Sequence, residues 1–119
     1  MTTARTITLR LPADAAFLSV ARLFGSSVAR IFELDAERAE DLRLVLSEIC
    51  AAATEGGADT ESHPSIDIDV SWDGPALRFS CVGVPIDADG PRWTLGRALM
   101  PDVRVDGAVE PTVSFSIDR

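Results

Sequence analysis

The chain has 119 residues, of which 46% are hydrophobic and 25% are charged. This length and composition predict one globular domain over residues 1–119 and argue against disorder. The net charge is -8 and the eleven Lys and Arg positions are all scattered arginines, which disfavours direct nucleic-acid binding. No apolar run approaches the roughly 18 residues of a membrane helix, and the N-terminus lacks the apolar core of a signal peptide. We therefore expect a cytoplasmic protein with no membrane association.

The N-terminal part is predicted to form a strand followed by a helix. Apolar and polar residues alternate over residues 5–11, which is typical of a half-buried strand. Pro12 ends this strand, and Asp14 can cap a helix that runs to about Phe32. Gly25 weakens the middle of this helix and would permit close packing. The predicted core positions of the helix are Phe17, Val20, Ala21, Phe24, Val28 and Ile31.

A second helix is predicted to begin at Asp35. Arg38 stands where a capping box has an acid, so the predicted cap is only partial. Glu48 interrupts the apolar middle of the helix, and residues 55–64 are predicted to form a polar loop. The predicted core stripe consists of Leu42, Val45, Leu46, Ile49 and Ala53.

The C-terminal half is predicted to contain two β-hairpins separated by a short helix. The strands are 65–72 with 76–84, joined by a tight turn, and 102–107 with 111–117. Residues 94–100 form the short helix, which Pro101 ends. The order β-α-α-β-β-α-β-β predicts an α+β two-layer sandwich, because alternating strands bury one face only. Its mostly antiparallel mixed sheet would be covered on one face by helices.

Neither the cysteines nor the histidine predicts a chemical site. Cys50 and Cys81 lie in apolar segments, so we expect two reduced core thiols rather than a disulfide. His63 has no Cys or His neighbour at the spacing of metal ligands, and a metal site is therefore not predicted.

The segment LVLSEICAAATEGG, residues 44–57, and the order of elements resemble the anti-sigma-factor serine kinases of the Bergerat-fold (GHKL, histidine kinase-like) ATPase superfamily. In that family this helix carries a Ser-Glu pair whose Glu is the general base. An Asn four residues after the Glu binds magnesium. Ser47 and Glu48 match the pair, but Ala52 stands at the Asn position. The resemblance implies that Glu48 is a relict general base, whereas the residues alone favour a glutamate that flanks the core stripe towards solvent.

The other nucleotide motifs of the family are degraded as well. In the family's Asp-x-Gly-x-Gly box, the Asp accepts the adenine amino group; here Gly83 stands near the Asp position and Pro85 near the first glycine. Gly96 alone remains of the glycines that cradle phosphate in the family. The chain contains no Asn that could replace the lost magnesium ligand. The resemblance therefore implies a domain without ATP or magnesium as cofactors.

The first predicted helix preserves a different part of the family pattern. Residues 17–24, FLSVARLF, resemble the segment through which these kinases contact protein partners, and Arg22 matches the partner-contacting arginine. A guanidinium fork suits bidentate pairing with an acidic group. The alternative is a solvated arginine at the edge of an amphipathic helix.

Three functions remain open from the sequence. The favoured one is an anti-sigma-like regulatory protein that binds a sigma factor or a STAS-type anti-sigma antagonist without ATP. The second is a residual ATP-dependent serine kinase, which Glu48 supports and Ala52 opposes. The third is a structural or dimerisation module, and a homodimer is compatible with all three.

Overall fold

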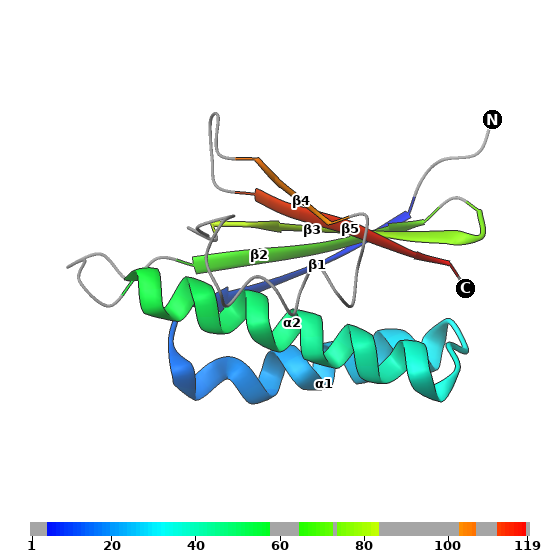
Figure 1. Cartoon of the computed structure of the whole chain (residues 1–119), viewed down its shortest axis with the longest axis horizontal. Coiled ribbons are helices and arrows are strands. Elements are labelled where there is room, and N and C mark those ends of the chain that lie inside the picture. The colour runs from blue at the N-terminus through cyan, green and yellow to red at the C-terminus, as the bar shows by residue number, and fades with distance from the viewer. Residues whose placement is uncertain (1–4, 58–64, 73, 84–102, 107–111, 119) are drawn as a thin grey trace.

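The computed structural model describes residues 5–57, 65–72, 74–83, 103–106 and 112–118. The described elements form two layers, in which a five-stranded sheet is covered on one face by two α-helices (Figure 1). This arrangement confirms the predicted α+β two-layer sandwich. The predicted helix at 94–100, together with Pro85 and Gly96, lies outside the described residues.

The sheet contains both predicted hairpins. Its strands are β1 (Arg5–Pro12), β2 (Ser65–Trp72), β3 (Ala76–Val82), β4 (Arg104–Asp106) and β5 (Thr112–Asp118). They lie in the order β1-β2-β3-β5-β4, and every pair among the described strands is antiparallel. The N-terminal strand β1 therefore pairs with β2 and places residues from both ends of the chain in one sheet.

The helices are a 3-10 turn η1 (Ala15–Phe17), then α1 (Leu18–Ile31) and α2 (Ala36–Gly57). The carboxylate of Asp14 accepts the backbone N–H of Ala16 at 2.9 Å and so caps η1, whereas α1 itself begins after Phe17 without a side-chain cap. Asp35 accepts the backbone N–H of Arg38 at 2.8 Å, and the Arg38 guanidinium donates to the same carboxylate at 2.7 Å. A capping box has an acid at this position. Here Arg38 instead orients the capping carboxylate of Asp35. The helix α2 continues to Gly57, so the first three residues of the predicted loop 55–64 are helical.

The core lies between the helices and the sheet. The predicted stripe on α2 is confirmed at four positions whose side chains are completely buried: Leu42, Val45, Leu46 and Ile49. The fifth, Ala53, has a side chain outside the described set. From the sheet, Phe79 and Phe115 stack with ring centroids 4.8 Å apart. Apolar and polar residues alternate along the strands, so the apolar side chains lie on the helix-covered face of the sheet.

The predicted core face of α1 is only partly correct. Ala21 and Val28 are buried as predicted, but Phe17 and Ile31 are 38% and 63% exposed. The reason is that α1 turns a face of small residues towards α2: a Cβ added to Gly25 would lie 3.2 Å from Cδ1 of Leu46. This rotation leaves Ile31 at the margin of the helix layer, whereas Phe17 lies in η1, before α1 begins.

Both cysteines are free and buried, which confirms the prediction. Burial raises the pKa of the Cys50 thiol to about 11 and also raises the pKa of Cys81. Both thiols are therefore protonated at neutral pH and behave as small apolar groups. Within the described residues, neither helix combines the length and apolar character that crossing a bilayer requires.

We expect Leu46→Ala to lower the free energy of unfolding by about 2–5 kcal/mol, because the side chain is fully buried and its neighbour Gly25 has no side chain to fill the cavity. Leu23→Ala is the matched control, since Leu23 is 66% exposed, and should change stability by less than about 0.5 kcal/mol. Urea unfolding measures both. Equal losses in the two variants would contradict the assigned helix orientation.

Candidate functional site

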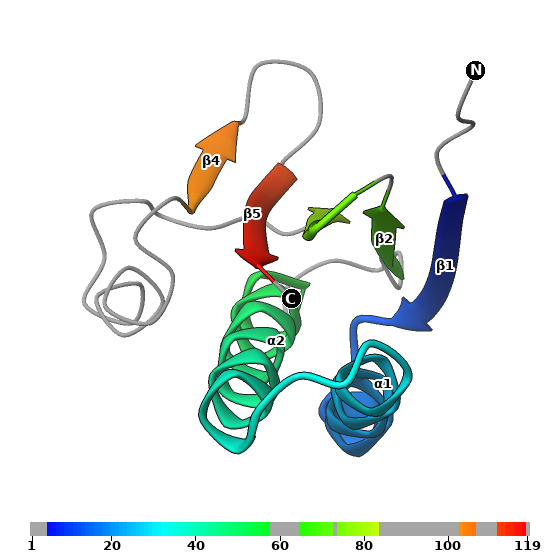
Figure 2. The same ribbon diagram turned by 90° about the vertical axis from the view of Figure 1, so that its right-hand side faces the viewer.

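The residues Arg22 and Ser47 connect α1 to α2, which lie side by side beneath the sheet (Figure 2). The Nε–H of Arg22 donates to the hydroxyl of Ser47 with an N–O distance of 2.8 Å. One further polar contact between the helices runs from the Arg43 guanidinium to the Ser26 hydroxyl at 3.5 Å, and Arg43 also pairs with Glu40. We call this surface, made of Arg22, Ser26, Glu40, Arg43 and Ser47, the helix-pair face.

Large apolar side chains are exposed beside the helix-pair face. Within the described residues the exposed ones all belong to the helix layer: Phe17, Leu23, Ile31 and Leu44. Leu23 directly follows Arg22 and is 66% exposed, the largest value among them. Exposed apolar groups beside a charged group are common in protein-binding surfaces.

Glu48 lies on the opposite flank of α2. Ser47 contacts α1, and consecutive helix residues are about 100° apart around the axis, so Glu48 points away from α1. Ala52 follows one turn later on the same flank and packs partly against the core. Glu48 is half-buried, not fully solvated as the residues alone suggested. Its role as a relict general base stays a prediction.

Gly83, which follows β3, has a backbone that excludes a side chain. Its φ angle is +93°, in the region that favours glycine. A Cβ added there would lie 2.5 Å from the carbonyl oxygen of Ser65, a distance that would require the backbone to shift. An aspartate near this position, as the family pattern has it, would not fit the present backbone.

The described residues do not fit a magnesium–nucleotide site of the family type. Ala52 has no ligand atom where the family has a magnesium-binding amide, and Gly83 leaves no room for an acceptor of the adenine amino group. Within the described chain, no cluster of His, Cys, Asp or Glu has the geometry to hold a metal ion. The degenerate positions Pro85 and Gly96 lie outside the described residues.

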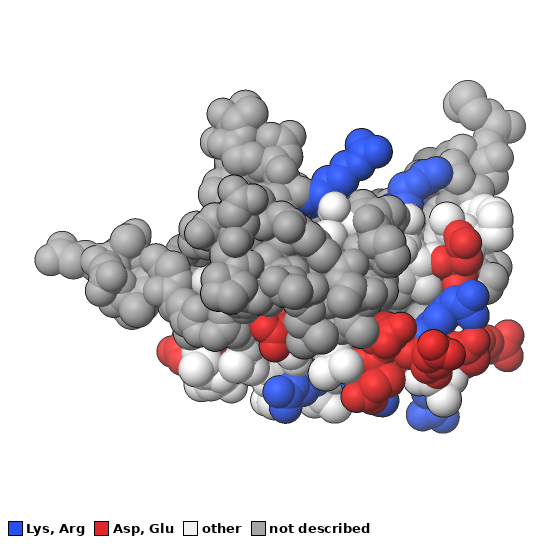
Figure 3. Space-filling view, viewed as in Figure 1, with Lys and Arg blue, Asp and Glu red and all other residues white. Residues whose placement is uncertain are grey.

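Acidic side chains gather over the beginning of α2 and the turn before it (Figure 3). They are Glu33, Asp35, Glu37, Glu40 and Asp41. Negative charge near a helix N-terminus is stabilised by the helix dipole. The same charges also form an acidic border at one end of the helix pair, which would attract a cationic surface.

The sequence pattern singles out Arg22 and Ser47 separately but does not predict their hydrogen bond. The pairing depends on how the two helices are rotated, and periodicity alone does not fix that rotation. It also assigned Ile31 to the core, although that side chain is exposed. Gly25 was the available signal, because a glycine between helices indicates where their backbones approach.

We expect Gly83→Ala to destabilise the fold by at least about 1–2 kcal/mol, since a Cβ is disfavoured at positive φ and would also clash with Ser65. Gly74→Ala is the control, because a Cβ there meets no atom within 4 Å. Its stability should change by less than about 1 kcal/mol. Thermal and urea unfolding distinguish the two variants, and indistinguishable stabilities would show that the backbone at Gly83 is not constrained.

No protein-family model and no curated protein matches the sequence. Among solved structures, the fold is similar to the crystal structure of the RsbU and RsbW domains of Rv1364c from Mycobacterium tuberculosis, with a TM-score of 0.76 and 20% sequence identity. The match covers 96% of this chain but 32% of that chain, so the present chain spans about a third of the matched one. At this identity the similarity establishes a shared, RsbW-like fold.

Proposed function

We propose that this chain is an anti-sigma-like regulatory domain that binds a protein partner through the helix-pair face and does not use ATP. The partner would be a sigma factor or a STAS-type anti-sigma antagonist. The fold shared with a structure that contains an RsbW domain supports this proposal, as does the match of Arg22 and Ser47 to the family pattern.

The hydrogen bond between Arg22 and Ser47 is the main observation that supports the proposal. Arg22 is exposed, yet its Nε–H donates a hydrogen bond to Ser47 on α2. An arginine that is already ordered loses less conformational entropy when it binds. Its terminal N–H groups make no other side-chain hydrogen bond or ion pair within the described residues. They can therefore bind a carboxylate of the partner in the bidentate geometry that guanidinium groups favour.

Two neighbouring features support a protein as the occupant of this face. Leu23 offers an apolar side chain beside the charged group, and arginine with a nearby apolar contact is a common centre of binding energy. The acidic border at the beginning of α2 would attract a basic region of the partner and speed its association. A sigma factor that carries a basic region beside an apolar contact would satisfy both.

The residual serine kinase is the second candidate, and one observation favours it. Ser47 and Glu48 retain the family pair, and Glu48 is half-buried on the flank that also carries Ala52. A general base needs a nucleotide held in place, however, and neither Ala52 nor Gly83 can contribute to that. The binding function is therefore the stronger proposal. If the chain is instead a dimerisation module, we expect Leu23 to lie in the contact between two copies.

We expect Arg22→Ala to weaken the partner complex at least about tenfold, equivalent to about 1.4 kcal/mol, while the melting temperature stays within a few degrees. The loss of one exposed hydrogen bond to Ser47 accounts for the small stability change. Calorimetry or surface plasmon resonance with a partner isolated by pull-down gives the affinity.

Arg30→Ala is the matched control, because Arg30 is another exposed arginine of α1. It should bind the partner as wild type does. Ser47→Ala keeps the Arg22 charge but removes its anchor, so an intermediate loss is expected. If Arg22→Ala and Arg30→Ala lose equal affinity, only net charge matters and the specific role of Arg22 is refuted.

We also expect no binding of ATP or ADP at sub-millimolar concentration, with or without magnesium. A phosphate chain needs a metal or oriented donors to leave water, and Ala52 provides no ligand. Isothermal titration calorimetry on the purified chain tests this. Transfer of phosphate to a serine of the partner would refute the proposal in favour of the kinase.

A further inference from the structure

The face of the sheet opposite the helices is polar. Strand residues alternate between the two faces, so the neighbours of the buried positions share this open face. Its described members include Thr8, Arg10, Asp67, Asp69, Ser71, Arg78, Ser80, Arg104, Ser114 and Ser116. In Figure 1 the helices lie below the sheet and the open face points away from them.

At the β1–β2 end of the open face, the acidic groups are paired. Arg10 donates to Asp67 through Nε at 2.6 Å and through a terminal nitrogen at 3.0 Å. Thr8 donates its hydroxyl to Asp69 at 2.6 Å. The hydrogen bond from Arg10 lowers the pKa of Asp67. Arg10 therefore neutralises Asp67, whereas the hydrogen bond to Asp69 comes from a neutral hydroxyl.

The other end of the open face carries two arginines that have no such partner in the part of the chain that the structure describes. Arg78 on β3 is opposite Ser116, and Arg104 on β4 is opposite Ser114, so the arginines stand on either side of β5. Both are exposed, and neither makes an ion pair or side-chain hydrogen bond within the described residues. Asp118 shares the face one step beyond Ser116 but is not paired with Arg78.

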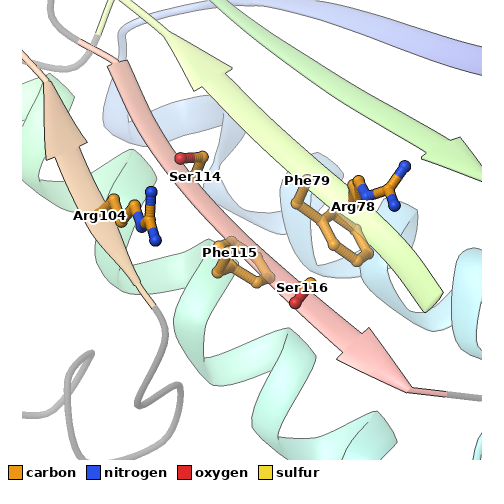
Figure 4. Close-up of a pocket in the computed structure, with 6 residues that line it drawn as sticks. All are labelled: Arg78, Phe79, Arg104, Ser114, Phe115 and Ser116. Carbon is orange, nitrogen blue, oxygen red and sulfur yellow. The ribbon is translucent and has the colours of Figure 1, made fainter.

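The two arginines border one pocket, whose volume is about 340 Å³ (Figure 4). Its lining consists of Arg78, Phe79, Arg104, Ser114, Phe115 and Ser116. Adjacent strands are about 4.8 Å apart, so β3 and β4 are separated by about 10 Å across β5. Long guanidinium side chains can close over a small anion in that interval, with the Ser114 hydroxyl beneath it.

We propose that Arg78 and Arg104 form a binding site for a phosphate monoester on the open face of the sheet. The site is separate from the helix-pair face and does not depend on its function. A phosphate monoester carries nearly two negative charges and three terminal oxygens, enough for two guanidinium forks and a hydroxyl. A carboxylate has one charge and two oxygens, which a single arginine already satisfies.

The charge of the whole chain makes this site distinctive. With a net charge of -8, the protein repels anions on average, so binding of a dianion requires a local concentration of donors. Asp69, Asp106 and Asp118 share this face, but Arg78 and Arg104 form no ion pair within the described residues, and two cations over one pocket supply that concentration. The ligand chemistry is shared by free phosphate and by a phosphorylated side chain.

The test is calorimetric titration of the full chain with phenyl phosphate and, for comparison, benzoate at low ionic strength. Phenyl phosphate should bind at least about tenfold more tightly than benzoate, because it offers the second charge and the third oxygen. Arg78→Ala and Arg104→Ala should each weaken phenyl phosphate binding about tenfold or more. Arg30→Ala, on α1 in the other layer, should leave binding unchanged. Unfolding midpoints confirm that these exposed substitutions preserve the fold.

Inorganic phosphate and a short phosphoserine peptide identify the source of the group. Arg78→Ala should weaken the binding of both ligands. The ligand that binds the wild-type chain more tightly identifies the natural form. The proposal is overturned if neither phenyl phosphate nor the peptide binds saturably at millimolar concentration, if Arg78→Ala and Arg104→Ala bind as wild type does, or if benzoate binds as tightly as phenyl phosphate.

Discussion

The close approach of α1 to α2 at Gly25 determines the geometry of the helix layer. A glycine at this point lets the α1 backbone approach Leu46 and Arg43, where a Cβ would already be in tight contact. Close packing sets the rotation of both helices, and rotation decides which side chains meet. Arg22 reaches Ser47 because of it, and Leu42, Leu46 and Ile49 are directed to the core.

One-sided burial follows from the same arrangement. Two helices cover one face of the sheet, which therefore collects the aliphatic and aromatic side chains. The opposite face is left with serine, threonine, aspartate and arginine. The molecule consequently presents two unlike surfaces. On the helix-pair face, Arg22 is hydrogen-bonded to Ser47 beside the exposed Leu23. On the open sheet face, Arg10 pairs with Asp67 at one end, and at the other end two arginines have no ion pair within the described residues.

Much of this fold could be predicted from the sequence, for identifiable reasons. Residues 65–72 alternate so regularly that the strand bounds agree with the structure. The stripe Leu42, Val45, Leu46 and Ile49 agrees because its members recur at three- and four-residue steps. Ile31 was assigned to the core because periodicity does not distinguish a helix facing a sheet from one that also faces a helix. The left-handed backbone at Gly83 and the Arg22–Ser47 bond depend on tertiary packing, which local patterns do not encode.

We propose that partner binding persists here without a nucleotide. If ATP bound the domain and altered its affinity for the partner, linkage would require the partner to alter the affinity for ATP equally. The most direct measurement is therefore the dissociation constant of the partner complex with and without millimolar magnesium–ATP. We expect the same value in both conditions. A change of about tenfold or more would contradict it, because a ligand that does not bind cannot shift the equilibrium.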